Sequence, residues 1–104
     1  MQTDLQKNKG RSRILEISLE NEIDHLSAAR LSREIRREIM RQRPEKLILD
    51  FRKVTMMDSS GIGLLLGRYK QMKDYGGELA IKNTSKQVDK VLTLSGLYQI
   101  IRKI

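Results

Sequence analysis

The sequence of 104 residues contains no cysteine and only one histidine, His25. Without thiols the chain forms no disulfide, no thiolate nucleophile and no cysteine-ligated metal site. A single imidazole cannot build a histidine-rich metal site. Tryptophan is absent too, and aromatic residues make up only 4% of the chain. We therefore expect no metal and no cofactor.

Long hydrophobic runs are also missing. No apolar stretch approaches the roughly 20 residues that a membrane-spanning helix needs. The initial segment "MQTDLQKNKGRSR" is not followed by the apolar segment of a secretion signal, so we expect a cytoplasmic protein. Hydrophobic residues at 38% and charged residues at 33% are typical of a globular protein. Because a chain this short has material for one core, we expect a single domain over residues 1–104.

The charge is strongly positive, with a formal net value of +8. Arg30, Arg33, Arg37 and Arg41 follow one another at three- and four-residue steps, which places them in one stripe along a predicted helix. We favour a solvated helix face, then a docking face for an acidic protein. Clustered basic residues also attract nucleic acids, but no aromatic residue lies among the arginines as a stacking platform. Nucleic-acid binding is therefore the minor alternative.

The hydrophobic pattern changes its period several times along the chain. Two strands are predicted around a turn at residues 8–10, followed by strands at "KLILDF" (46–51), "ELAIKN" (78–83) and "LYQIIRKI" (97–104). Helices are predicted from Asp24 to Pro44, from Ser59 to the Gly76-Gly77 pair, and within "SKQVDKVLTLSG" (85–96). In the second helix we expect one buried face, made of Ile62, Leu65, Leu66, Tyr69 and Met72. The alternation predicts an α/β domain with a mixed, largely parallel sheet of about four to five strands and helices packed against it.

The segment "MMDSSGIGLLLGRYKQMKDYGGEL" (56–79) contains two serines and two glycines where the chain turns from a strand into the second helix. Asp58 is a good N-cap, so Ser59 and Ser60 should occupy the first helical positions. The glycine spacing fits neither a dinucleotide fingerprint nor a phosphate-binding loop, and the nucleophile elbow of hydrolases is absent. One interpretation is thus a capped helix whose small residues allow close packing.

The other interpretation is a serine that receives a phosphate. A phosphoryl group adds about −1.5 to −2 charges, and the amino terminus of a helix tolerates an anion well. Modification at Ser59 would then leave the fold intact and change the surface. Inside a protein interface, an unpaired phosphate costs several kcal/mol, on the order of a hundredfold or more in affinity.

Residues 56–79 closely resemble the phosphorylated loop and following helix of the anti-sigma-factor antagonists, the small STAS-domain proteins of bacterial sporulation and stress control. "NEIDHLSA" (21–28) resembles the start of that family's first helix, and "SGLYQIIRKI" (95–104) resembles its terminal strand. The likeness runs from about Ile14 to the end of the chain. It departs at Asn21, where the family usually has glycine, although asparagine also tolerates turn geometries. It departs again at Ile104, where members commonly continue into another helix, and we expect a monomer or a weak dimer.

The resemblance implies a partner-switching cycle. The unmodified antagonist binds an anti-sigma factor that is also a serine kinase, which frees the sigma factor; phosphorylation breaks the complex, and a separate phosphatase restores it. The implied phospho-acceptor is Ser59. The implied partner-binding residues are Glu22, Asp24, Asp58, Ser60, Gly61, Ile62 and Gly63. For Glu22 and Asp24 a polar turn with a helix cap is an equally good interpretation.

This interpretation makes the chain a regulator and not an enzyme, without catalytic residues of its own. ATP is expected to enter on the partner kinase, because the chain contains no nucleotide-binding motif. One alternative is a STAS interaction subunit of a transport or scaffold assembly that is not phosphorylated. The remote alternative is a basic nucleic-acid-binding protein.

Overall fold

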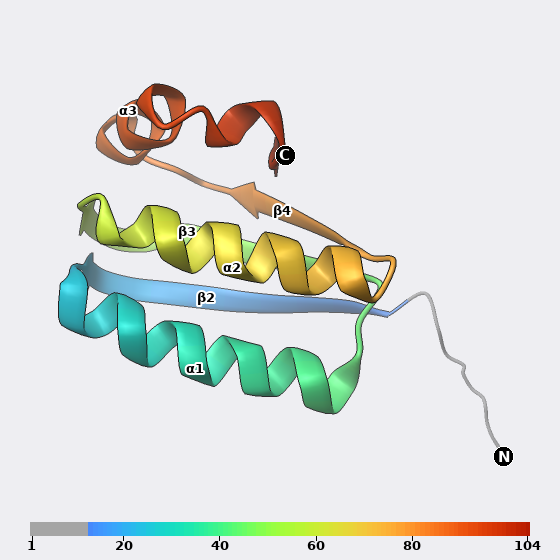
Figure 1. The fold of residues 1–104 in the computed structure, drawn as a ribbon. Helices are drawn as coiled ribbons and strands as arrows, with labels where there is room; N and C mark the ends of the chain where they lie inside the picture. Colours follow the sequence, from blue (N-terminus) through green and yellow to red (C-terminus); the bar gives the residue numbers. More distant parts are fainter. Residues whose placement is uncertain (1–12) are drawn as a thin grey trace, which may run out of the picture.

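A computed structural model describes residues 13–104 of the chain (Figure 1). The elements are β2 (Ile14–Ile23), α1 (His25–Gln42), β3 (Lys46–Met57), α2 (Ser60–Asp74), β4 (Glu78–Lys82), α3 (Lys86–Leu94), a 3₁₀ helix (Leu97–Gln99) and β5 (Arg102–Lys103). This order confirms the predicted alternation from β2 onward. The first strand of the predicted amino-terminal pair, with its turn at residues 8–10, lies outside the described residues.

The four described strands form one sheet in the order β2-β3-β4-β5, and each neighbouring pair is parallel. The predicted α/β fold is therefore confirmed, with a sheet that is parallel throughout residues 13–104. In Figure 1, α1 and α2 run side by side along the strands, and α3 lies beyond β4. No helix in this part of the chain is long and apolar enough to cross a membrane.

The core lies between the sheet and the helices. The apolar run of β3 is buried on both faces of the sheet, with Leu47, Ile48, Leu49 and Phe51 at most 8% exposed, as expected for a central parallel strand. The helices contribute mainly branched aliphatic side chains and one methionine; those fully or almost fully buried are Ala28, Ile35, Ile39, Leu64, Leu65, Met72, Val88 and Leu92.

The buried face of α2 differs from the predicted one. Leu65 and Met72 are buried as expected, but Ile62, Leu66 and Tyr69 are only partly buried. The centre of the face is formed instead by Gly61, Leu64, Leu65, Arg68 and Met72. Residues 62–66 are apolar at four of five positions, so their periodicity does not single out one side of the helix.

The predicted final strand over residues 97–104 is wrong in its first half. Gly96 has a left-handed φ of 80° and is followed by the 3₁₀ helix, and only Arg102 and Lys103 pair with β4. The Tyr98 hydroxyl and Lys103 Nζ both donate hydrogen bonds to the Asp89 carboxylate of α3. These bonds hold the turn against α3, and this tertiary contact overrides the local preference for a strand.

The pairing of β2 with β3 contains two bulges. Between Ser18 and Glu20, and again between Asn21 and Glu22, β3 contains one residue more than β2. Asn21 has a left-handed φ of 63°, a conformation that asparagine adopts more readily than most residues. Beyond the bulges, Met57 lies opposite Ile23, so both strands end at the same edge of the sheet.

Candidate functional site

The segment that joins β3 to α2, residues 58 and 59 together with the first residue of the helix, Ser60, is called the switch loop here. It lies at the carboxyl edge of the sheet, where loops of parallel α/β sheets commonly form sites. The Asp58 amide donates a hydrogen bond of 3.1 Å to the carbonyl of Ile23, the last residue of β2. The next element along the chain from Ile23 is α1, which begins at His25. The switch loop and the start of α1 are therefore side by side.

The structure starts α2 at Ser60, one residue later than predicted. Ser59 is the N-cap, with helical φ and ψ of −64° and −14°, and its side chain makes no capping hydrogen bond. The predicted cap, Asp58, still acts on the helix start, because its Oδ1 accepts from the Ser60 amide at 2.8 Å. Ser59 is exposed, and its hydroxyl forms no hydrogen bond within residues 13–104. Of the two serines, Ser59 thus offers the more accessible hydroxyl.

The two glycines after the loop have different surroundings. Gly61 is buried, and a Cβ atom there would lie 2.3 Å from Sδ of Met57, so α2 can approach the end of β3 only without a side chain at this position. Gly63 is exposed, and a Cβ atom there would have no neighbour within 4 Å. Close packing thus accounts for the glycine at position 61. At Gly63 no such contact requires a glycine, and its missing side chain leaves the backbone of α2 accessible beside the loop. Partner contact at Gly61, Ile62 and Gly63 stays a prediction.

At the start of α1, Asp24 is the N-cap of a complete capping box. Its Oδ1 accepts from the Ser27 amide at 3.0 Å, while the Asp24 amide donates to Ser27 Oγ at 2.8 Å. The hydrogen bonds that the Asp24 carboxylate accepts from the Ser27 amide and the Ser27 hydroxyl lower the pKa of Asp24. The backbone carbonyl of Glu22 accepts a hydrogen bond from Ser27 Oγ at 2.9 Å. The exposed carboxylate of Glu22 has no partner in the described part of the chain. Asp24 therefore has a clear structural role, whereas the Glu22 carboxylate is free for an external contact.

A shallow depression of about 290 Å³ lies beside the switch loop, between the first halves of α1 and α2; we call it the loop depression. Its lining residues are His25, Ala28, Ala29, Ser32, Ser60, Gly63 and Leu64. Leu26 in the first turn of α1 is 81% exposed. These α1 residues were not predicted from the sequence as part of the site. The sequence feature that could have indicated them is Leu26, an apolar residue in the first turn of α1 that lies outside the buried stripe of the helix.

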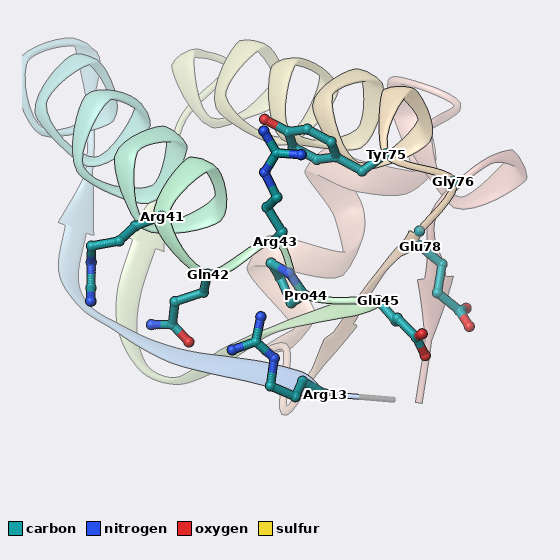
Figure 2. Close-up of a pocket in the computed structure, with 10 residues that line it drawn as sticks. Arg13, Arg41, Gln42, Arg43, Pro44, Glu45, Tyr75, Gly76 and Glu78 are labelled. Atoms are coloured by element: carbon teal, nitrogen blue, oxygen red, sulfur yellow. The ribbon is translucent and has the colours of Figure 1, made fainter. Parts of the chain in front are cut away.

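A larger hollow of about 700 Å³ lies at the opposite edge of the sheet, where α1 ends and β3 and β4 begin (Figure 2). Its walls contain charges of both signs, among them Arg13, Arg41, Glu45 and Glu78. In Figure 2 the Arg43 side chain extends toward Tyr75, and its guanidinium lies 5.5 Å from the centre of that ring. Because these charged groups do not converge on one point, we assign no ligand to this hollow. Within residues 13–104, no cluster of three or more histidine, aspartate or glutamate side chains could hold a metal ion.

Comparison with known proteins identifies the family. The STAS domain model matches residues 6–104. The chain belongs to the STAS domain family. This STAS protein is 32% identical over 101 residues to the anti-sigma F factor antagonist of Paenibacillus polymyxa. The aligned region covers 97% of this chain and 84% of that relative.

Solved structures agree with this assignment. The anti-sigma factor antagonist SpoIIAA in its unphosphorylated form superposes with a TM-score of 0.78 at 29% identity, over 95% of this chain and 86% of that one. The Bacillus cell fate determinant SpoIIAA in its phosphorylated form gives a TM-score of 0.68 at 28% identity, over 95% and 89% of the two chains. The resemblance stated from the sequence is therefore confirmed at the level of the family and the fold.

Proposed function

We propose that this STAS protein is an anti-sigma-factor antagonist whose binding to an anti-sigma factor is switched off by phosphorylation of Ser59. The observation that carries the proposal is the Ser59 hydroxyl, which is exposed beside Asp58 at the start of α2 and forms no hydrogen bond with the residues that the structure describes. Its relatives support the same role, because SpoIIAA is an anti-sigma factor antagonist with an unphosphorylated and a phosphorylated form. A partner that controls a sigma factor acts in the cytoplasm.

The unmodified switch loop offers a surface that a protein can cover. Gly63 and the loop depression lie next to Ser60, and Leu26 exposes an apolar side chain on the adjacent turn of α1. Asp58 and Glu22 add carboxylates at the same edge of the sheet, where a basic group of the partner can pair with them. We expect the partner to bury this loop.

Phosphorylation transfers the γ-phosphoryl group of ATP to the Ser59 oxygen. The bond between that phosphorus and its bridging oxygen breaks, ADP leaves, and the serine proton passes to a base of the kinase. This chain supplies only the acceptor and its position, so we assign it no catalytic role. The added dianion lies next to the Asp58 carboxylate, so a basic group that pairs with Asp58 would leave the phosphate buried without a counter-charge of its own, at a cost of several kcal/mol, on the order of a hundredfold or more in affinity. A separate phosphatase would then restore binding.

The fold should tolerate the modification. Ser59 is exposed, and its hydroxyl contributes no hydrogen bond to the described structure that a phosphate would remove. The first amides of α2 lie at the positive end of the helix dipole, which stabilises a nearby anion. Phosphorylation should therefore change partner affinity and leave the free energy of unfolding close to its original value.

The test is the intact mass of the protein after incubation with ATP and the candidate anti-sigma kinase from the same genome. Ser59→Ala and Ser60→Ala are the matched controls. One added phosphoryl group in the wild type and in Ser60→Ala, but not in Ser59→Ala, supports the proposal. A Ser59→Asp variant should also lose affinity for the partner. If the kinase modifies another antagonist but not this chain, and Ser59→Asp still binds, the protein is a binding module without phosphorylation.

A further inference from the structure

Arg68 is the only charged side chain that is buried among residues 13–104, with 8% of its surface exposed. It lies between α1 and α2, where its Nη1 donates to the carbonyl and the hydroxyl of Ser32, both at 2.6 Å. No carboxylate of the described residues pairs with it, and its buried Nε has no hydrogen-bond partner there. Burial, with a smaller contribution from the charge of Arg36, lowers the pKa of Arg68. A buried guanidinium without a counter-ion is unfavourable, and the Nε of this one still lacks an acceptor within the described residues.

Arg68 also lines a depression of about 340 Å³ between the second halves of the two helices, which we call the seam depression. Arg36 and Lys70 bring two further cations to it, against one carboxylate, that of Asp74. Met40 and Tyr75 supply apolar flanks and are 51% and 39% exposed. The seam depression is therefore positive at its centre and apolar at one end.

The surface of α1 around the seam depression has an excess of unpaired positive charge. The helix contains five arginines and two glutamates, and each glutamate already pairs with one arginine. Arg33, Arg36 and Arg37 form no ion pair within the part of the chain that the structure describes. Arg36 was not part of the stripe predicted from the sequence, yet it is the member of this group that reaches the seam depression.

We propose that an acidic segment of the anti-sigma partner docks along the seam of α1 and α2, with one carboxylate side chain bound between Arg36 and Arg68. This inference rests on the proposed function, because it assigns a second contact to the same partner. The two surfaces are continuous, since Ser32, which accepts from Arg68, also lines the loop depression beside Ser60. A protein that covers the switch loop can extend from there to the seam depression.

The geometry favours a peptide over a nucleic acid. Arg68 is recessed between two helices, where the side chain of a glutamate or aspartate can enter but the phosphates of a duplex cannot follow. A planar guanidinium forms two parallel hydrogen bonds with a carboxylate or a phosphate alike, so the recessed position of Arg68, and not the pairing itself, favours the peptide. Tyr75 is not a free stacking platform, because Arg43 lies 5.5 Å from its ring centre.

The test is calorimetric titration of the candidate anti-sigma factor from the same genome into Arg36→Gln, with Arg30→Gln as the matched control. Both substitutions remove one charge from an exposed position of α1, but Arg30 pairs with Glu34 and does not line the seam depression. We expect Arg36→Gln to raise the Kd for the partner about tenfold and Arg30→Gln to change that Kd less than about twofold. Both variants should keep the wild-type Tm.

Equal losses in the two variants would indicate long-range attraction by net charge and would overturn a local carboxylate contact. An unchanged Kd in Arg36→Gln would overturn the seam as a docking surface while leaving the Ser59 switch intact. Absence of any binding by the wild type would refute the proposed function and this inference together. A labelled DNA duplex is the second probe: tight binding that Arg36→Gln abolishes would assign the seam to nucleic acid and refute the acidic peptide.

Discussion

The packing at Gly61 leads to a quantitative prediction. In Gly61→Ala the new Cβ would lie 2.3 Å from Sδ and 2.5 Å from Cγ of Met57, whose side chain is fully buried and has little room to move. Overpacking of this kind costs about 1–3 kcal/mol. Alanine gains up to about 1 kcal/mol over glycine in helix propensity, which partly offsets the loss. We expect a net loss of up to about 2 kcal/mol, or a fall in Tm of up to roughly 15 °C.

Gly63→Ala is the matched control, because both glycines lie in the first turn of α2 but Gly63 has open space around it. The propensity gain is shared, so the difference between the two variants isolates the steric cost and should be about 1–3 kcal/mol. Urea unfolding followed by circular dichroism measures both free energies. A third chain, Met57→Ala with Gly61→Ala, removes the clashing side chain, so the second substitution should cost nothing in that background. Equal stability of the two single variants would refute the packing argument.

Three further predictions concern other parts of the fold. In Gly77→Ala the Cβ would lie 2.7 Å from the carbonyl oxygen of Glu45. A backbone carbonyl moves less readily than a side chain, so urea unfolding should show that the free energy of unfolding falls by an amount near the upper end of about 1–3 kcal/mol. Asp24→Ala should lower the unfolding midpoint and Asp24→Asn should keep it, because asparagine also accepts the capping hydrogen bond; equal midpoints would contradict the capping role. Burial and the hydrogen bond to Asp89 raise the pKa of Tyr98 to about 12. Its contribution to stability is therefore complete below the unfolded value of about 10 and disappears as pH rises from there through about 12, and a Tyr98→Phe variant should show a flatter alkaline stability profile.

Much of the fold was predictable because local signals and tertiary structure agree. The apolar run at 46–51 predicted the central strand, and the helical period after Asp24 predicted α1. The glycine pair after α2 also acted as expected, since the helix ends at Asp74 and Gly76 adopts a left-handed φ of 74°. At such positions, sequence alone is enough.

The errors occur where contacts between distant segments decide the outcome. The apolar first half of α2 does not show which side faces the sheet, and a buried arginine in the middle of that face runs against the usual preference. The first half of the strand predicted at 97–104 is replaced by a 3₁₀ turn whose Tyr98 bonds to Asp89, nine residues earlier. Neither contact is visible in the local period.

The candidate site was predictable in position but not in detail. The serines and glycines that follow the central strand, together with the family resemblance, pointed to the segment after β3, and the structure brings it beside Glu22 and Asp24. The sequence could not separate Gly61 from Gly63, because the difference depends on Met57 lying beneath one of them. Whether these residues contact a partner stays a prediction.

Because of the two bulges between β2 and β3, the number of residues in β3 determines where the proposed recognition surface lies relative to α1. Side chains alternate between the faces of a strand, so removing one residue from the end of β3 would reverse the face of every residue between the deletion and the end of the strand. The Asp58 amide would then no longer meet the Ile23 carbonyl, and Ser59 would leave its place beside α1. A natural relative could preserve all the switch-loop residues and still lose the switch through a single-codon deletion upstream. In comparing members of this family, the spacing between the β3 core and the serine is therefore as informative as the identity of the serine.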